Sequence, residues 1–406
     1  GLIVAVIGAA LGWAAVHVAC RSGLASTVMA RRFGFGRRGS ALASAVFAFM
    51  LIGFIAAENV LLYKGFLFWL GAEDSPGTRL LCYGVLTAAW IALTAWGFAV
   101  VTRVSALMTV SFLGVLVWML AGIVADAGQT WLGILDGGAL RAGGGIHGGE
   151  GAGLVFCINM LAGSAGALAL VDADLGRWSR SSLDIGIAAA LGNFALDVLM
   201  IFLGAVIMHA GLPALTDYYV QVEGLGREAA REVALANPDR VAAAFIVFGG
   251  VLGTFLMVAA QSKAQVLNTY SSSLSLANIC DVLLGRRPGR LAFVVLANLL
   301  SWLFLAGDFL AWFHDFLVIL GVLTMCLAGI MVADWFIVRP RLPAAQREAG
   351  EREAVNGAGL ATLVIGTLLA HWLLAPFVPV QIGTALAASF LVYPALRLTL
   401  FRPRAA

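Results

Sequence analysis

Long apolar runs follow one another along almost the whole chain and are separated by short polar connections. A helix needs about 20 apolar residues to cross the hydrocarbon core of a bilayer, and runs of roughly this length recur. They cover residues 1–20, 41–70, 80–101, 104–125, 152–175, 185–209, 241–264, 290–306, 309–335, 357–375 and 378–399. The pattern therefore predicts an all-α, polytopic membrane protein.

The amino-acid composition excludes the alternative of a soluble protein with a buried apolar core. Of the 406 residues, 61% are hydrophobic and 12% are charged, whereas soluble domains carry about 25% charged residues. The five cysteines are scattered along the chain, which indicates small helix residues rather than a metal site. Nucleotide-binding and hydrolase motifs are missing from the sequence, so we expect no enzyme, no cofactor and no metal.

Arginines gather in every second connection. Residues 21–40 contain five arginines and no acidic residue, and more arginines lie at 103, 177–180, 286–290, 339–341 and 397–404. Basic connections stay in the cytoplasm. The pattern therefore predicts a multi-pass protein of the plasma or inner membrane with its C-terminus on the cytoplasmic side. Because these arginines lie in short connections at the membrane edge, nucleic-acid binding is not expected. Since the chain opens with Gly1 inside an external apolar run, we expect a preceding span to be missing from this sequence.

Ionisable and amide side chains inside the apolar runs mark candidate functional positions, because such groups are costly in a membrane. The second run carries Glu58 and Asn59, and the seventh carries Lys263 among three amides, Gln261, Gln265 and Asn268. A charge at the bilayer centre costs at least about 2.5–3.5 kcal/mol, so Lys263 needs a partner. The candidates are Glu58, Asp197 of the sixth run and carbonyl groups at a helix break.

Two glycines in the fifth run leave two interpretations open. Gly163 and Gly166 suit close packing of helices, and they equally suit a helix that is broken at mid-membrane to meet a ligand.

Four stretches are similar to a known transporter family. They are RSGLASTVMARRFGFGRRGS (21–40), LAGSAGALALVDADLGRWSRS (161–181), NTYSSSLSLANI (268–279) and FLVILGVLTMCLAGIMVADWFIVRP (316–340). In this order and spacing they resemble segments of the purine–cytosine permeases, the nucleobase:cation symporter-1 family. The first run would correspond to the family's second helix.

The resemblance implies a fold with two inverted five-helix repeats of the leucine-transporter type, two extra C-terminal helices, and the first helix missing. Residues 1–340 would form the transporter core, 341–356 a cytoplasmic linker, and 357–406 the last two helices and the tail.

The resemblance also implies a substrate site at mid-membrane. Phe54 and Glu58, one helical turn apart on one face, correspond to a stacking ring and a polar group. The unwound part of the family's sixth helix corresponds to Gly163, Ser164 and Ala165, and the eighth helix supplies Gln265 and Asn268. The family usually has a second aromatic residue on its sixth helix; here Ser164 or Ala165 replaces it, so the exact substrate stays open.

The family's sodium site corresponds to Ala259, Ser262 and Lys263. In the family a backbone carbonyl and two hydroxyls hold the ion, and Lys263 replaces the second hydroxyl. We predict that the ammonium group takes the place of the transported cation and that transport is sodium-independent. Proton coupling through Lys263 and uniport both remain open.

From these features we expect a permease for a nucleobase or related small heterocycle, embedded in the lipid bilayer, with a proton or a sodium ion as the coupling partner. The alternatives are a carrier of an amine or cationic vitamin precursor and a membrane sensor that binds its ligand without moving it.

Overall fold

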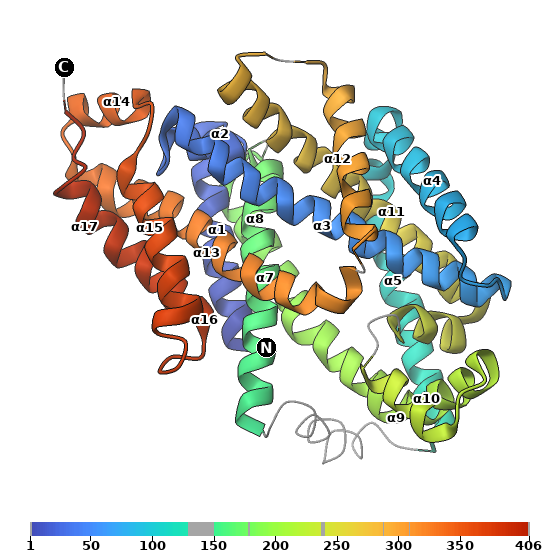
Figure 1. Ribbon diagram of the computed structural model, residues 1–406. Helices are drawn as coiled ribbons and strands as arrows, with labels where there is room; N and C mark the ends of the chain where they lie inside the picture. Colours follow the sequence, from blue (N-terminus) through green and yellow to red (C-terminus); the bar gives the residue numbers. More distant parts are fainter. Residues whose placement is uncertain are drawn as a thin grey trace.

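The secondary structure is helical throughout the part of the chain that the computed structural model describes, residues 2–128, 150–177, 179–236, 240–286, 288–307 and 309–404. Figure 1 shows the arrangement. The helices are α1 (Leu2–Ser22), α2 (Ser26–Arg32), α3 (Gly36–Leu70), α4 (Pro76–Ala92), α5 (Phe98–Asp126), α7 (Glu150–Gly176), α8 (Ser182–Phe194), α9 (Ile201–Glu223), α10 (Arg227–Ala236), α11 (Arg240–Leu284), α12 (Arg290–Leu305), α13 (Phe313–Ala333), α14 (Ala344–Arg352), α15 (Gly357–Leu368), α16 (Gln381–Ala387) and α17 (Tyr393–Leu398).

Short turns of other helix types join or end several of these helices. Five are π-helical, η1 (Leu93–Gly97), η4 (Ala195–Met200), η6 (Asp334–Val338), η8 (Leu369–Leu373) and η9 (Ala388–Val392), and two are 3-10 turns, η5 (Phe309–Trp312) and η7 (Arg339–Arg341).

Each apolar run predicted from the sequence is helical, although some runs extend over two consecutive helices and the turn between them. Not every helix is long enough to span a membrane. Within the described residues, eight helices are long and apolar enough to cross a membrane, or nine if one bent pair is a single span. The run predicted at 290–306 is α12, which has 16 residues and is shorter than the usual spanning length. The run predicted at 378–399 is divided into α16, η9 and α17.

Local sequence signals account for the connection between α3 and α4. Gly71 ends α3 with a left-handed φ of 60°, a conformation that favours glycine. The Ser75 hydroxyl caps α4 by accepting from the Thr78 backbone N–H, and the Thr78 hydroxyl accepts from the Ser75 backbone N–H in return. Pro76 occupies the first turn. A capping box with proline at this position is a strong helix start.

The helix that changes direction sharply is α11, and the change falls at Gly250. This residue has φ 51° and ψ −137°, values that only glycine adopts without strain. The bend brings Gly253 so close to Phe245 that a Cβ on Gly253 would lie 2.2 Å from the Phe245 carbonyl oxygen. The glycine therefore divides α11 into a short first part and a long second part that ends at Leu284.

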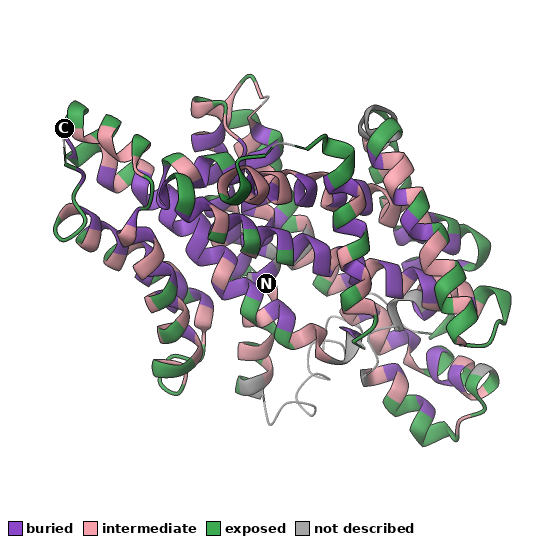
Figure 2. Ribbon diagram, turned by 45° about the horizontal axis from the view of Figure 1, so that its top comes forward, coloured by how far each residue is buried: buried purple, intermediate pink, exposed green. Residues whose placement is uncertain are grey.

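Two groups of helices form the centre of the molecule. In one, α1 packs against α7 and α8, and α7 packs against α13; in the other, α3 lies along α11. Buried residues concentrate where these helices meet, whereas the outer faces are exposed and apolar, as lipid-facing surfaces are (Figure 2). Residues 341–356, predicted as a linker, contain α14, which packs against α2 and α3.

Candidate functional site

The two helices predicted to hold the substrate bring their polar side chains together. The Asn268 Nδ2 group on α11 donates to Glu58 Oε1 on α3 at 3.2 Å. One helical turn before Asn268, Gln265 Nε2 donates to the Ile55 carbonyl oxygen at 3.0 Å. The seam between α3 and α11 is therefore fastened by amide side chains within an otherwise apolar environment.

The polar seam extends to residues that the sequence analysis did not assign to the site. Asn59 Oδ1 accepts from the Trp90 indole N–H at 2.8 Å and from Gln265 Nε2 at 3.3 Å. A tryptophan inside an apolar run needs an acceptor for its indole N–H. That requirement is the signal that could have connected Trp90 with Asn59.

Three polar atoms at this seam have no hydrogen-bond partner within the described part of the chain. They are Glu58 Oε2, Asn59 Nδ2 and Gln265 Oε1, and all three are buried. Leaving a buried polar group unsatisfied costs about 1–3 kcal/mol, and buried polar groups in native proteins almost always have partners. Two acceptors and one donor at one seam are a suitable arrangement for a polar ligand.

Phe54 lies beside this seam, one helical turn before Glu58, and its ring meets an aromatic cluster formed by α12, η5 and α13. The ring is edge-on to Phe316, with centroids 6.0 Å apart. Gly53 provides the space, because a Cβ there would come within 2.3 Å of Phe316. Phe316 in turn contacts Phe304, Phe309 and Trp312, so Phe54 is at the edge of an aromatic wall.

The expectation of an unwound fifth run is wrong. α7 continues without a break from Glu150 to Gly176. Gly163 faces α13 so closely that a Cβ would lie 2.7 Å from the Leu317 carbonyl oxygen, and a Cβ on Gly166 would lie 2.3 Å from Thr324 Oγ1. The glycines thus serve close helix packing, which is one of the two interpretations that the sequence left open.

On a continuous helix, Gly163, Ser164 and Ala165 cannot all face one site, because residues two apart differ by about 200°. Ala165 is fully buried and faces α1 near Gly8, not Phe54. The side chain of Ser164 lies outside the described residues.

Lys263 faces α5 rather than the acidic partner that the sequence suggested. Its Nζ donates to Thr109 Oγ1 at 3.1 Å, whereas Glu58 is held by Asn268. The two directions agree with helix geometry, because Lys263 and Asn268 are about 140° apart around α11. Glu58 is thus excluded as the partner of Lys263, and the side chain of Asp197 lies outside the described residues.

The other predicted cation ligands, Ala259 and Ser262, lie on the same stretch of α11. The Ser262 hydroxyl donates to the Val258 carbonyl oxygen of its own helix at 2.7 Å, as serines inside helices often do. Its oxygen keeps a free lone pair, so this bond is compatible with holding a cation.

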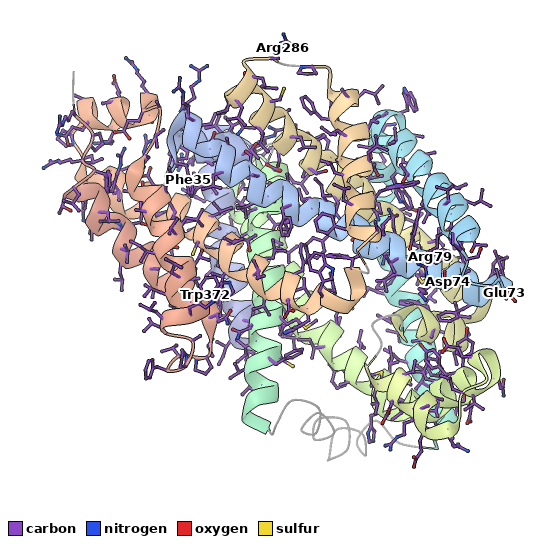
Figure 3. All side chains as sticks on the ribbon, viewed as in Figure 1. Phe35, Glu73, Asp74, Arg79, Arg286 and Trp372 are labelled. Atoms are coloured by element: carbon purple, nitrogen blue, oxygen red, sulfur yellow. The ribbon has the colours of Figure 1, made fainter. Side chains whose placement is uncertain are left out.

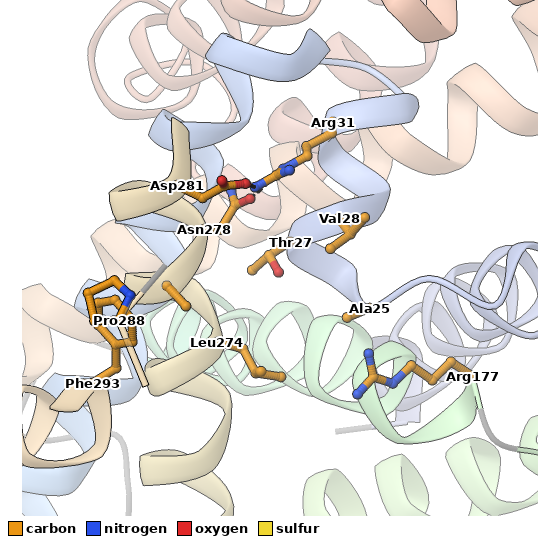
Figure 4. Close-up of a pocket in the computed structure, with 11 residues that line it drawn as sticks. Ala25, Thr27, Val28, Arg31, Arg177, Leu274, Asn278, Asp281, Pro288 and Phe293 are labelled. Atoms are coloured by element: carbon orange, nitrogen blue, oxygen red, sulfur yellow. Dashed lines mark hydrogen bonds and ion pairs between the residues drawn. The ribbon is translucent and has the colours of Figure 1, made fainter. Parts of the chain in front are cut away.

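A second polar cluster lies at the arginine-rich end of the molecule, where α2 meets the ends of α7 and α11 (Figure 4). Arg31 on α2 donates to Asn278 and pairs with Asp281 at 2.7 Å. Asp174, near the end of α7, accepts from both the backbone N–H and the hydroxyl of Ser26 at 2.7 Å. Arg31, Asn278 and Asp281 line a cavity of about 340 Å³ together with their neighbours, and α2 joins the two helix ends.

Comparisons with known proteins identify the fold. No family model matches the chain, and no curated protein does. Among solved structures, the chain resembles Mhp1 in an inward-facing conformation, with 19% identity, a TM-score of 0.66, and coverage of 98% of this chain and 82% of Mhp1. It also resembles closed Mhp1, described as a nucleobase-cation-symport-1 family transporter with bromovinylhydantoin bound, with 18% identity, a TM-score of 0.69, and coverage of 97% and 83%.

A third solved structure, a Na+-coupled sialic acid symporter in a substrate-bound outward-open state, gives 15% identity and a TM-score of 0.56 over 97% of this chain and 83% of that one. At these identities the likeness concerns the fold. The protein is a polytopic membrane protein that is helical in the residues the structure describes, and it has the leucine-transporter fold. This confirms the fold expected from the sequence.

Proposed function

We propose that the protein is a secondary transporter for a nucleobase or a related small heterocycle, recognised at the seam between α3 and α11. The observation that carries this proposal is the set of unpartnered buried atoms: Glu58 Oε2, Asn59 Nδ2 and Gln265 Oε1. A ligand that supplies one acceptor and one or two donors would satisfy them.

A nucleobase-like ring fits these groups chemically. Such rings carry ring N–H groups beside carbonyl groups, so an N–H would donate to Glu58 Oε2 while the neighbouring carbonyl would accept from Asn59 or Asn268. The flat ring would lie against Phe54, since aromatic rings favour stacked or edge-on contacts worth about 0.5–1.5 kcal/mol beyond area burial. The fold shared with a nucleobase-cation-symport-1 transporter supports the same class of ligand.

The test is uptake of radiolabelled cytosine, uracil and hypoxanthine into vesicles that contain the purified protein. We expect one of them to accumulate above protein-free vesicles. In Glu58→Gln the competition profile among the three should change, because a carboxylate only accepts hydrogen bonds and an amide also donates. An unchanged profile would return Glu58 to a structural role.

A second candidate is a carrier of an amine or cationic ring, and a specific feature favours it. The carboxyl group of Glu58 has an unpartnered oxygen within the described residues, and a positive substrate would pair with it. Competition by amines that is lost in Glu58→Gln, with neutral bases inactive in the wild type, would establish this alternative. Binding without uptake would instead identify a sensor.

We also propose that Lys263 takes the place of a coupling sodium ion, next to Ala259 and Ser262. Its ammonium group donates to Thr109, so a cation is held between α11 and α5 with no metal required. Transport should then persist when sodium is replaced by choline. Lys263→Thr restores a hydroxyl and should gain sodium stimulation, whereas strong sodium dependence of the wild type would refute the idea.

The orientation that we propose places the arginine-rich end and the C-terminus in the cytoplasm, because basic connections stay on that side. Arg31 pairs with Asp281 near the end of α11. Arg32 and Arg339 both pair with Glu351, so these arginines belong to one end of the molecule. In Figure 1, α2, α14 and the connection after α11 lie along its upper edge.

A further inference from the structure

A second cavity at the arginine-rich end is independent of the transport function proposed above. It measures about 380 Å³ and is lined by Leu24, Val28, Arg31, Arg32, Arg37, Glu351 and Arg352. These residues come from three places: α2 and the residue before its cap, the first turn of α3, and the end of α14. Four arginines and one glutamate give the lining a clear positive excess.

Two of the arginines are already used to build the site. Arg31 is paired with Asp281 at 2.7 Å, and Arg32 pairs with Glu351 at 3.3 Å. Glu351 also pairs with Arg339 at 2.6 Å. These contacts fix α2 and α14 relative to the rest of the molecule and use up the one negative charge of the lining.

The other two arginines keep their guanidinium groups available. The side chain of Arg37 is exposed, and no side-chain partner is recorded for it among the described residues. Arg352 reaches only Glu348, at 3.8 Å, with both side chains more than two-thirds exposed, and surface pairs of this kind contribute little.

The backbone holds these two guanidinium-bearing residues together. The N–H of Arg37 donates to the Glu353 carbonyl oxygen at 2.9 Å, and the N–H of Arg38 donates to that of Ala354. The start of α3 is therefore fastened directly to the residues that follow Arg352. Two cations of like sign are kept at one cavity with an apolar wall of Leu24 and Val28.

Guanidinium groups bind phosphate oxygens in a bidentate manner and do so better than ammonium groups. Leu24 follows the end of span α1, Arg32 shortly precedes span α3, and Arg37 lies in the first turn of α3; the ends of spans lie at headgroup depth in a bilayer. We propose that Arg37 and Arg352, with Arg32, form a binding site for a phosphate-bearing anion, supplied either by an anionic phospholipid headgroup or by a soluble phosphate.

The test uses the full chain, purified in detergent, and native mass spectrometry with defined additives. Phosphatidylglycerol and phosphatidylcholine are added separately, and inorganic phosphate and glycerol 3-phosphate are added as competitors. The double variant Arg37→Gln/Arg352→Gln removes the free guanidinium groups. The control Arg286→Gln removes an exposed arginine at the same end of the molecule (Figure 3) that does not line this cavity.

We expect the wild type and the control to retain one phosphatidylglycerol at least tenfold better than phosphatidylcholine. Since a hydrogen bond to a charged group is worth about tenfold or more in affinity, the double variant should lose retention by tenfold to a hundredfold. The variant Arg37→Lys/Arg352→Lys keeps both positive charges but lacks the guanidinium groups that bind phosphate in a bidentate manner. It should therefore retain phosphatidylglycerol at a level between those of the wild type and the double glutamine variant.

Displacement of the lipid by millimolar inorganic phosphate, or direct binding of glycerol 3-phosphate, would assign the site to a soluble phosphate. If neither inorganic phosphate nor glycerol 3-phosphate displaces the lipid, the site binds the phospholipid headgroup. Equal retention of phosphatidylglycerol by the wild type and the double glutamine variant would overturn the proposal. So would equal retention of the two lipids by the wild type together with no binding of inorganic phosphate or glycerol 3-phosphate.

Discussion

Two seams between long helices hold the centre of this molecule, and they are built in opposite ways. Between α3 and α11 the contacts are amide and carboxyl side chains, including Glu58, Gln265 and Asn268. Between α7 and α13 the contacts are closely packed glycines, with Gly163 against the Leu317 carbonyl and Gly166 against the Thr324 side chain.

This difference suits the first seam to binding a ligand and the second to holding two helices together. The amide seam contains three buried polar atoms without partners in the described residues, each of which is costly unless a ligand or water meets it. The glycine seam is closed, because a single added Cβ would already overlap its neighbour. We therefore propose that ligand contacts belong to the first seam, while the second holds α13 in place against α7.

The largest effect should come from filling the glycine seam. Gly163→Ala puts a methyl group 2.7 Å from the Leu317 carbonyl oxygen, so the helices must separate, which costs about 1–3 kcal/mol. The control is Gly122→Ala on α5, which meets nothing within 4 Å and should be neutral or stabilising by up to about 1 kcal/mol. The unfolding temperatures of the two variants in detergent are compared. Equal temperatures would show that α7 and α13 are not closely packed at Gly163.

Local sequence patterns predicted the features that are determined within a single helix. Apolar runs located the helices, and the spacing of Phe54 and Glu58 gave their common face. The pairing of Glu58 with Asn268 required the resemblance as well, since nothing in either run alone determines which helices are neighbours.

What the sequence left undetermined depends on the neighbouring helix. The segment from Gly163 to Gly166 is compatible with a break or with close packing, and the proximity of α13 decides for packing. Conversely, the sharp bend at Gly250 lies in a run whose flanking apolar pattern is unbroken. Lys263 was matched to acidic groups on energetic grounds, yet its ammonium group is near the α5 hydroxyl of Thr109.

A smaller effect, on ligand binding rather than on folding, should come from opening the amide seam. Asn268→Ala removes the donor to Glu58 Oε1, and a hydrogen bond to a charged group is worth about 1.5–3 kcal/mol. We expect affinity for the proposed heterocyclic substrate to fall by roughly tenfold or more. Asn159→Ala is the matched control, because that amide binds backbone at Pro379 and Gln381; a comparable loss there would mean that the effect is general.

The smallest effect should come from a polar contact that faces solvent, at the connection between α3 and α4 (Figure 3). Arg79 donates to both carboxyl oxygens of Asp74, at 2.6 and 2.9 Å, and this contact is the main reason that the pKa of Asp74 is held well below its usual range. Tyr63 and Lys64 also contact Asp74, so the carboxylate keeps two partners when Arg79 is replaced.

Arg79→Gln should therefore cost less than about 1 kcal/mol at pH 7, as exposed ion pairs usually do. Because the pKa of Asp74 is depressed in the folded state, its contribution is complete above the unfolded pKa of about 4 and is lost as the pH falls toward the folded value. The difference in unfolding temperature between wild type and Arg79→Gln should shrink between pH 5 and about pH 3 and with added salt. A difference as large as that of Gly163→Ala, or one that grows in acid, would mean that this exposed pair supports the fold as strongly as the buried seams do.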